Sequence, residues 1–292
     1  MICWMFPGQP IAFGDPPSSD PEFQKIALLC REITGFNPLE TDPSASDISQ
    51  SVRLQLLGTC VSLYRANQLT NQGGGPDLIA EHSMGIYSAL AASGAIDNAT
   101  ALALTWRIGA AMAKLGMQRE YALGCVIGLT CAPLGAIATN NGVYIANHNT
   151  SRHFLLAGER AKVETALVEA TTSGAFSASI FSCDAPLHTP PIAEIAGDLQ
   201  RIVAEYRYSE PRIPLVEHVA QTTLAAAAIP RFLVDELCIP VYWETTYRAL
   251  RSRGGHGFKR WVSALRSPNS TAGSIVNHET SRNDHNRPLQ RN

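Results

Sequence analysis

The chain has 292 residues, with 23 Lys and Arg against 25 Asp and Glu, which gives a formal net charge of −2. A chain of this length can bury a large core, and 45% hydrophobic against 16% charged residues excludes a disordered body. The net charge is near zero, so the chain lacks the excess of basic residues that is typical of nucleic-acid-binding proteins. No apolar run reaches the roughly 18 residues of a membrane span. From the charge balance and the lack of such a run, we expect neither nucleic acid nor membrane as a partner.

The first elements in chain order alternate between strand and helix. The apolar start at 1–6 lacks the basic region and long apolar core of a secretory signal, so it predicts a first buried strand. Gly73–Pro76 breaks the chain before a second short strand, and Gly94 ends a helix as a left-handed C-cap. The predicted strands are 1–6 and 77–81, and the predicted helices are 23–34, 51–69, 84–93 and 98–115.

Between 122 and 187 the order becomes β-α-β-β-α-β, which is the ferredoxin-like pattern. The predicted strands there are 122–129, 143–148, 154–158 and 176–182, and the helices are 132–140 and 159–173. The remaining elements are helices at 191–206, 230–238 and 244–252 and a strand at 213–219. We therefore predict an α/β fold with a large subdomain at 1–121 and 188–266, an inserted small subdomain at 122–187 and a disordered tail at 267–292.

The seven cysteines are widely spaced and contain no C-x-x-C pair. This usage predicts a reducing cytoplasm, with the cysteines as small buried hydrophobes. None of the eight histidines has ligand spacing to a cysteine pair, so we expect no zinc site.

A serine at the junction of a buried strand and a helix is the strongest local sign of chemistry. Ser83 lies in AEHSMG at 80–85, the context of a nucleophile elbow. The backbone N–H of Met84 would then be an oxyanion donor at the start of the helix. Ser-x-Gly is common, however, and Ser83 alone could equally be a helix N-cap.

A serine nucleophile needs a base, and His188 in APLHTP at 185–190 follows a predicted strand on a loop stiffened by two prolines. On its own it could equally be a surface histidine. Arg107 lies on a mostly apolar helix, where an arginine either binds an anion or extends its charge to solvent. The turn FPGQ at 6–9 would let backbone amides approach a ligand.

These fragments, in this order, resemble the malonyl-CoA:acyl-carrier-protein acyltransferase family. They are FPGQ at 6–9, PDLIAEHSMGIYSAL at 76–90, TWRIGAAM at 105–112, YIANHNTSRHFLLAGE at 144–159, CDAPLHTPPI at 183–192 and IPVYWE at 239–244. Each piece is weak by itself, but the ordered set is specific. The resemblance covers roughly residues 1–250.

The resemblance implies a hydrolase-like parallel-sheet core and a ping-pong transfer of malonyl groups from malonyl-CoA to the pantetheine thiol of an acyl carrier protein. Ser83 would be the nucleophile and His188 its base, with the backbone N–H groups of Gln9 and Met84 as the oxyanion hole. Arg107 would pair with the malonyl carboxylate. A backbone carbonyl near Glu236 would orient the histidine, and no metal or redox cofactor is implied.

His82 and Leu187 flank the two catalytic positions, and we predict that both contact the substrate. Leu187 could crowd a branched acyl group, which favours malonyl over methylmalonyl. For an acidic carrier protein we expect a modest basic patch, with Arg152, Arg160 and Lys162 as candidates. Fatty acid synthesis, polyketide synthesis and malonate decarboxylase assembly remain open as pathways.

The sequence departs from the family at two places near the expected site. The family's FPGQG reads FPGQP here, with Pro10 beside the oxyanion turn, and GHSLG reads EHSMG, with Glu81 before the nucleophile. An unpaired charge at Glu81 would be costly, so we expect its carboxylate to be paired or turned to solvent. These changes indicate a divergent member. They leave two alternatives: a thioester hydrolase acting on carrier-bound acyl groups, and a catalytically decayed interaction protein.

Overall fold

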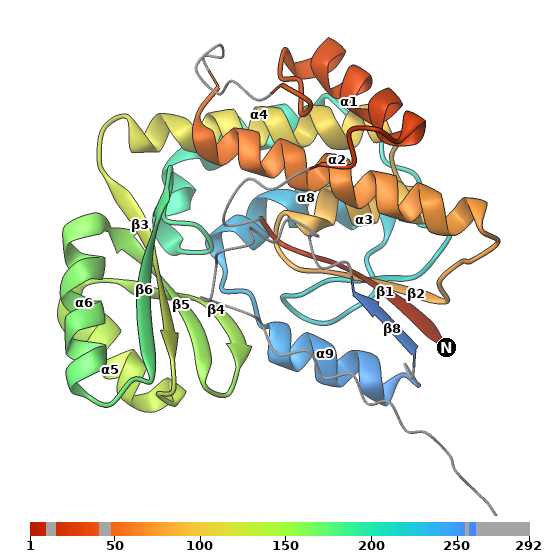
Figure 1. Ribbon diagram of the computed structural model, residues 1–292. Helices are drawn as coiled ribbons and strands as arrows, with labels where there is room; N and C mark the ends of the chain where they lie inside the picture. The colour runs from red at the N-terminus through yellow and green to blue at the C-terminus, as the bar shows by residue number, and fades with distance from the viewer. Residues whose placement is uncertain (10–15, 41–47, 255–256, 261–292) are drawn as a thin grey trace, which may run out of the picture.

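The described residues form two four-stranded sheets with flanking helices. The computed structural model describes residues 1–9, 16–40 and 48–254, together with the backbone of 257–260. Figure 1 shows one sheet under a layer of long helices and the other sheet to its side, with two helices on its outer face. The expectations for Pro10 and for the tail at 267–292 lie outside the described residues.

The first sheet is parallel throughout, with strand order β7-β2-β1-β8. Its strands are β1 (Ile2–Phe6), β2 (Leu78–Glu81), β7 (Leu215–Val216) and β8 (Gly257–Arg260). β1 and β2 are nearly continuous runs of buried residues, as expected for strands covered on both faces. Both were predicted from the sequence. β8 was missed, because its glycine and two basic residues conceal a strand pattern.

The strand predicted at 213–219 is only two residues long in the structure. Pro214 precedes it and has no N–H to donate to a ladder. After Val216 the carboxylate of Glu217 accepts the backbone N–H groups of Val219 and Ala220, which turns the chain. The prediction was therefore too long at both ends, for identifiable reasons.

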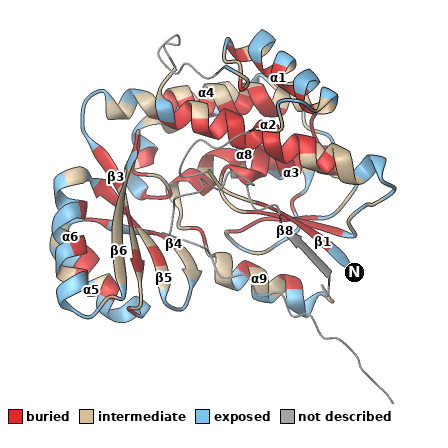
Figure 2. Cartoon of the chain, viewed as in Figure 1, coloured by how far each residue is buried: buried red, intermediate tan, exposed pale blue. Residues whose placement is uncertain are grey.

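Four helices cover the parallel sheet, and Figure 2 shows that their inner faces are buried. They are α1 (Pro21–Thr34), α2 (Gln50–Asn71), α3 (Gly85–Ser93) and α4 (Asn98–Gly116). Their ends follow local chemistry: the Asp20 side chain caps α1, Ser49 caps α2, and Gly94 ends α3 with a φ of 79°. The predicted helices in this region are confirmed.

The second sheet is antiparallel, with strand order β4-β5-β3-β6. Its elements alternate as the sequence predicts: β3 (Tyr121–Ile127), α5 (Cys131–Asn141), β4 (Tyr144–Thr150), β5 (His153–Glu159), α6 (Arg160–Thr172) and β6 (Ser177–Cys183). α5 and α6 bury residues such as Leu134 and Val163 in a core that this sheet has to itself.

The C-terminal elements are short. They are η2 (Pro190–Ile195), α7 (Ala196–Ala204), η3 (Ala226–Ala228), α8 (Ile229–Asp235), η4 (Glu236–Cys238) and α9 (Trp243–Ser252). The single helix predicted at 191–206 is divided at Ile195, whose φ of −109° is not helical. Its first part is a 3-10 helix that begins at two consecutive prolines.

Backbone hydrogen bonds join the small sheet to the segment before α9. The His148 N–H donates to the Val241 carbonyl at 2.8 Å, and the Val241 N–H donates to the Ala146 carbonyl at 2.8 Å. The segment before α9 thereby extends the β4 edge, and it fixes the small sheet next to the carboxyl ends of β1 and β2.

All seven cysteines are free thiols. Cys3, Cys30, Cys60 and Cys183 are buried as predicted. For Cys131 the prediction is wrong, because this residue opens α5 on its solvent side and is exposed. Among the described residues, no helix has both the length and the apolar character that crossing a bilayer requires.

Candidate active site

Ser83 occupies a strained turn between β2 and α3. Its φ is 55°, in the left-handed region that non-glycine residues rarely adopt. The turn is tight because the start of α3 packs on the end of β1: a Cβ added to Gly85 would lie 2.5 Å from the Phe6 carbonyl oxygen. Backbone strain of this kind concentrates at functional sites, and here it presents a serine hydroxyl at the end of a parallel strand.

The structure brings Ser83 and His188 together, as the sequence predicts. The Ser83 Oγ lies 2.6 Å from Nε2 of His188, which has a φ of 58° on its loop and is 2% exposed. Its Nδ1 lies 3.0 Å from the backbone carbonyl of Glu236. Since a carbonyl only accepts, we assign the proton to Nδ1, which leaves Nε2 free to accept from the serine hydroxyl.

Burial keeps His188 neutral. Loss of solvation is the main cause, the charge of His218 adds to it, and together they lower the pKa of His188 to about 3. The hydrogen bond to the Glu236 carbonyl acts in the opposite direction. At neutral pH the imidazole is therefore unprotonated, which is the state that a general base needs.

The 7–9 loop lies directly against the elbow. The His82 N–H donates to the Phe6 carbonyl at 3.0 Å, and a Cβ on Gly8 would lie 2.8 Å from Nδ1 of His82. Gln9 is tied to α2 through its side-chain amide, which donates to Ser51 Oγ at 3.2 Å. Met84 immediately precedes α3, where backbone N–H groups have no intrahelical acceptor. The geometry is compatible with the predicted oxyanion pair, which remains a prediction.

His82 and Leu187 lie on either side of this centre. The Nε2 of His82 is 3.1 Å from Asn149 Oδ1, and its ring packs edge-on against Trp243 with centroids 5.3 Å apart. His82 therefore sits where β4 meets α9. Leu187 is half-buried and packs on the main core cluster. Their predicted contacts with substrate stay predictions.

Arg107 is engaged by a neighbouring acid. Its two terminal nitrogens each donate to an oxygen of Glu205 at 2.6 Å, and Nη1 also donates to the Tyr206 hydroxyl at 3.2 Å. Glu205 raises the pKa of Arg107, and Arg107 lowers the pKa of Glu205. The two side chains are 30% and 57% exposed, so the pair is weakly held. Binding of a substrate carboxylate at Arg107 would require exchange of this partner.

A buried group of three ionisable side chains lies behind His188. Glu81, His218 and Glu236 are at most 1% exposed. Glu81 is paired with His218 through a 2.7 Å contact between Oε1 and Nδ1, which bears out the expectation that its carboxylate is either paired or exposed. His218 carries no role in the sequence prediction. A histidine next to an acid within the strand predicted at 213–219 was the available signal.

His188, His218 and Glu236 offer ligand atoms within 4.8 Å of one another, a spacing that a metal ion could use. The Nδ1 atoms of both histidines already have partners, however, in the Glu236 carbonyl and in Glu81. Nε2 of His188 is engaged by Ser83 Oγ, so this histidine has no ring nitrogen left for a metal, and the set fits a metal poorly.

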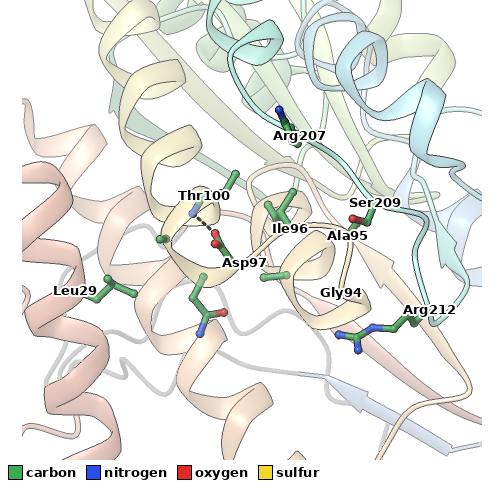
Figure 3. A pocket seen from close by; sticks show the side chains of 12 residues that line it. Leu29, Gly94, Ala95, Ile96, Asp97, Thr100, Arg207, Ser209 and Arg212 are labelled. Atoms are coloured by element: carbon green, nitrogen blue, oxygen red, sulfur yellow. Dashed lines mark hydrogen bonds between the residues drawn. The ribbon is translucent and has the colours of Figure 1, made fainter.

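An open depression of about 820 Å³ lies at the far end of α3. Figure 3 shows Gly94, Asp97, Arg207 and Arg212 around it, with Asp97 capping Thr100 at the start of α4. Ser83 precedes the first residue of α3, and Gly94 follows its last one. The depression is therefore separated from Ser83 by the length of that helix.

Comparisons with known proteins agree with this geometry. A family model described as acyl transferase domain matches residues 38–249. The malonyl CoA-acyl carrier protein transacylase of Escherichia coli is 28% identical over 267 residues, which are 87% of this chain and 86% of that protein. The malonyl-CoA:acyl carrier protein transacylase structure from Xanthomonas oryzae has a TM-score of 0.80 at 25% identity, covering 88% of this chain and 86% of that one.

A further relative is much longer than this chain. The polyketide biosynthesis protein ThaF of Burkholderia thailandensis is 26% identical over 266 residues. The match takes in 88% of this chain but only 23% of ThaF. The chain thus spans about a quarter of that protein's length.

Proposed function

The chain belongs to the acyl transferase domain family, and we propose that it transfers a malonyl group from malonyl-CoA to the pantetheine thiol of an acyl carrier protein. The observation that carries the proposal is the 2.6 Å contact between Ser83 Oγ and Nε2 of a neutral, buried His188. The similar proteins of Escherichia coli and Xanthomonas oryzae are named as transacylases for this pair of substrates.

The reaction proceeds by two acyl transfers through one serine. His188 takes the hydroxyl proton while Ser83 Oγ attacks the thioester carbonyl, and the backbone N–H groups of Gln9 and Met84 receive the developing oxyanion. His188 then gives its proton to the departing CoA thiolate, leaving a malonyl-serine ester. The carrier-protein thiol reverses these steps. The chemistry uses protons and hydrogen bonds, with no metal or redox cofactor.

We propose that the two sheets belong to two subdomains. The parallel sheet with its helices would be the hydrolase-like large subdomain at 1–121 and 188–266, and 122–187 the ferredoxin-like small subdomain. The β-α-β-β-α-β order and the antiparallel pairing β4-β5-β3-β6 support the second assignment. The strained strand-to-helix turn at Ser83 supports the first.

The malonyl group would bind in the space around His82 and Leu187, with its carboxylate at Arg107. In this arrangement the substrate carboxylate replaces Glu205 as the bidentate partner of the guanidinium. The exposure of the existing pair supports such an exchange, because a pair open to solvent contributes little to stability.

The carrier protein would approach across the junction of the two sheets. Of the basic side chains expected there, Arg160 and Lys162 already pair with nearby glutamates, and Arg152 donates to the Gly128 carbonyl. They would present a mixed rather than a strongly basic surface. The seven free cysteines are compatible with a cytoplasmic location, and either fatty acid or polyketide synthesis would supply the carrier protein.

The test is intact-mass analysis after mixing the protein with malonyl-CoA, followed by addition of holo carrier protein. We expect a malonyl adduct on Ser83 that disappears as the carrier protein gains the same mass. Ser83→Ala should keep the fold and form no adduct. An adduct on the alanine variant would show that another residue is the nucleophile. Release of free malonate without a carrier protein would instead indicate a hydrolase.

A further inference from the structure

The buried group behind His188 is not used by the transfer chemistry described above. Glu81, His218 and Glu236 come from the end of β2, the turn after β7 and the start of η4. All three side chains are buried, and burying ionisable groups is costly unless they are paired with one another. Their contacts therefore indicate what the arrangement does.

The contacts form one continuous chain that ends at the catalytic pair. Oε1 of Glu81 accepts hydrogen bonds from the backbone N–H of His218 at 3.1 Å and from its Nδ1 at 2.7 Å. On the other side of the ring, Nε2 of His218 lies 3.6 Å from Oε2 of Glu236. That same oxygen lies 3.5 Å from Nδ1 of His188.

The hydrogen-bond pattern locates the protons. Glu81 Oε1 accepts two N–H bonds, so Nδ1 of His218 carries a hydrogen, and we assign the negative charge of the group to Glu81. Nε2 of His218 and Oε2 of Glu236 are both buried and have no hydrogen-bond partner among the described residues. These two atoms lie 3.6 Å apart, longer than a hydrogen bond, and a small approach with the proton on Glu236 would satisfy both. Burial raises the pKa of both Glu81 and Glu236, and the backbone hydrogen bond from His218 acts to lower only that of Glu81, in keeping with two carboxyl groups that share one proton held by Glu236.

We propose that Glu81, His218 and Glu236 are positioning residues that form a proton-sharing relay, which stabilises the imidazolium of His188 during acyl transfer. The inference rests on the proposed function, because only a base that becomes positively charged needs such a device. In the site described above, Glu236 contributes only its backbone carbonyl, which orients His188. The relay adds a role for the side-chain carboxyl group of Glu236.

The proton movements balance. As Ser83 Oγ gives its proton to Nε2 of His188, Glu236 Oε2 gives its own proton to Nε2 of His218. The result is two adjacent ion pairs, His188 with Glu236 and His218 with Glu81. Without the second transfer, the imidazolium of His188 would stand in a buried site without a charged partner. When CoA leaves, His188 gives its proton to the thiolate and Nε2 of His218 returns the other proton to Glu236.

Other ionisable groups also act on this cluster. The charge of Glu217 affects Glu81 and His218, and His82 affects His188. Tyr87 is buried beside the two relay carboxyl groups. Glu217 is committed elsewhere, because its carboxylate accepts the backbone N–H groups of Val219, Ala220 and Thr222. It therefore offers a control: a buried glutamate whose substitution removes a nearby charge but leaves the three relay side chains in place.

The experiment is single-turnover acylation by malonyl-CoA, with the rate constant and the Kd measured separately. Glu236→Gln keeps the backbone carbonyl that orients His188 and removes the shared proton. We expect its rate constant to fall by about 10- to 100-fold while the Kd stays within twofold. Glu217→Gln should lower the melting temperature, through loss of turn hydrogen bonds, and leave the rate constant within twofold.

A double-mutant cycle tests whether the residues act as one unit. Glu81→Gln should also slow acylation, but added to Glu236→Gln it should slow it by less than a further twofold, because the relay is already broken. Independent, multiplying effects would overturn the relay. So would a Glu236→Gln rate constant within twofold of wild type, or an equal loss in Glu217→Gln.

Histidine NMR of the unmodified protein covers the case in which Glu236→Gln does not fold. Nitrogen-15 shifts should show His218 protonated at Nδ1, and an unprotonated Nδ1 would overturn the relay. The two proposals fail differently. Absence of a malonyl adduct on the wild-type protein would refute the transfer, whereas an adduct formed at an unaltered rate by Glu236→Gln would refute the relay alone.

Discussion

Replacing Gly85 by alanine should distort the elbow, because the space for a side chain is occupied by backbone. A Cβ at this position would lie 2.5 Å from the Phe6 carbonyl oxygen and 2.8 Å from the Pro7 carbonyl oxygen. Neither atom can move by a change of rotamer, so β1 and α3 must separate. Overpacking of this kind costs about 1–3 kcal/mol. We expect the upper part of that range, about 2–3 kcal/mol, because two main-chain segments must shift.

The loss should appear in both stability and activity. For a chain of this size, 2–3 kcal/mol corresponds to a fall of roughly 4–10 °C in melting temperature, measurable by calorimetry or circular dichroism. Separation of α3 from β1 also moves Ser83 and Met84 away from the 7–9 loop. We expect acylation to slow by at least about tenfold, since small displacements of reacting groups are expensive.

Gly135 provides the matched control. It also lies within a helix, α5, but a Cβ there would meet nothing within 4 Å. Gly135→Ala should therefore stabilise the protein by about 0.5–1 kcal/mol and leave acylation unchanged. If Gly85→Ala has the melting temperature of the wild type and an acylation rate within twofold of it, the contact between β1 and α3 does not constrain the elbow and the reasoning is wrong.

Three further predictions concern the base and the acyl group. His188→Ala should slow acylation by several orders of magnitude. A loss below about tenfold would show that another residue is the general base, and His82 would be tested first. Because the pKa of His188 is about 3, the wild-type rate at pH 5.5 should stay above about 80% of its value at pH 7.5, whereas an ordinary histidine would leave about a tenth. In competition between malonyl-CoA and acetyl-CoA, Arg107→Ala should reduce the malonyl preference by about tenfold or more, and Glu205→Gln should lower the KM for malonyl-CoA by freeing the guanidinium. If the ratio of malonyl to acetyl adducts is unchanged in Arg107→Ala, this residue does not bind the substrate carboxylate and has only its ion pair with Glu205.

The sequence was sufficient for features that depend on neighbouring residues. Helix ends follow from Asp20, Ser49 and Gly94 acting within a turn of the chain, and the buried strand before Ser83 follows from a short apolar run. The order of elements in 122–187 was predictable for the same reason. Predicted strand ends were wrong where a side chain hydrogen-bonds the backbone in place of a neighbouring strand. At Glu217 the carboxylate accepts the backbone N–H groups that would otherwise extend β7.

Contacts between segments far apart in the chain were harder to predict from the sequence. The pairing of Ser83 with His188 joins two positions 105 residues apart. The local sequence offered His188 as one candidate base, and the family resemblance singled it out. The ion pair of Arg107 with Glu205 spans 98 residues and has no local signature. Periodicity placed Arg107 on an apolar helix, but it could not indicate which acid of a later helix would face it.

Strand order explains why the site assembles where it does. β2 pairs in parallel with β1 on one side and with β7 on the other, in registers that match Phe6 with Glu81 and Ala80 with Val216. The carboxyl ends of the three strands therefore meet at one edge of the sheet, the usual place for a site in a parallel α/β fold. The 7–9 loop, the elbow and His218 follow those ends in turn. Glu81 meets His218 because their strands are neighbours, so the pairing of an acid two residues before the nucleophile with this histidine is a consequence of topology. Its use in supporting His188 depends on Glu236, which η4 brings to the same edge.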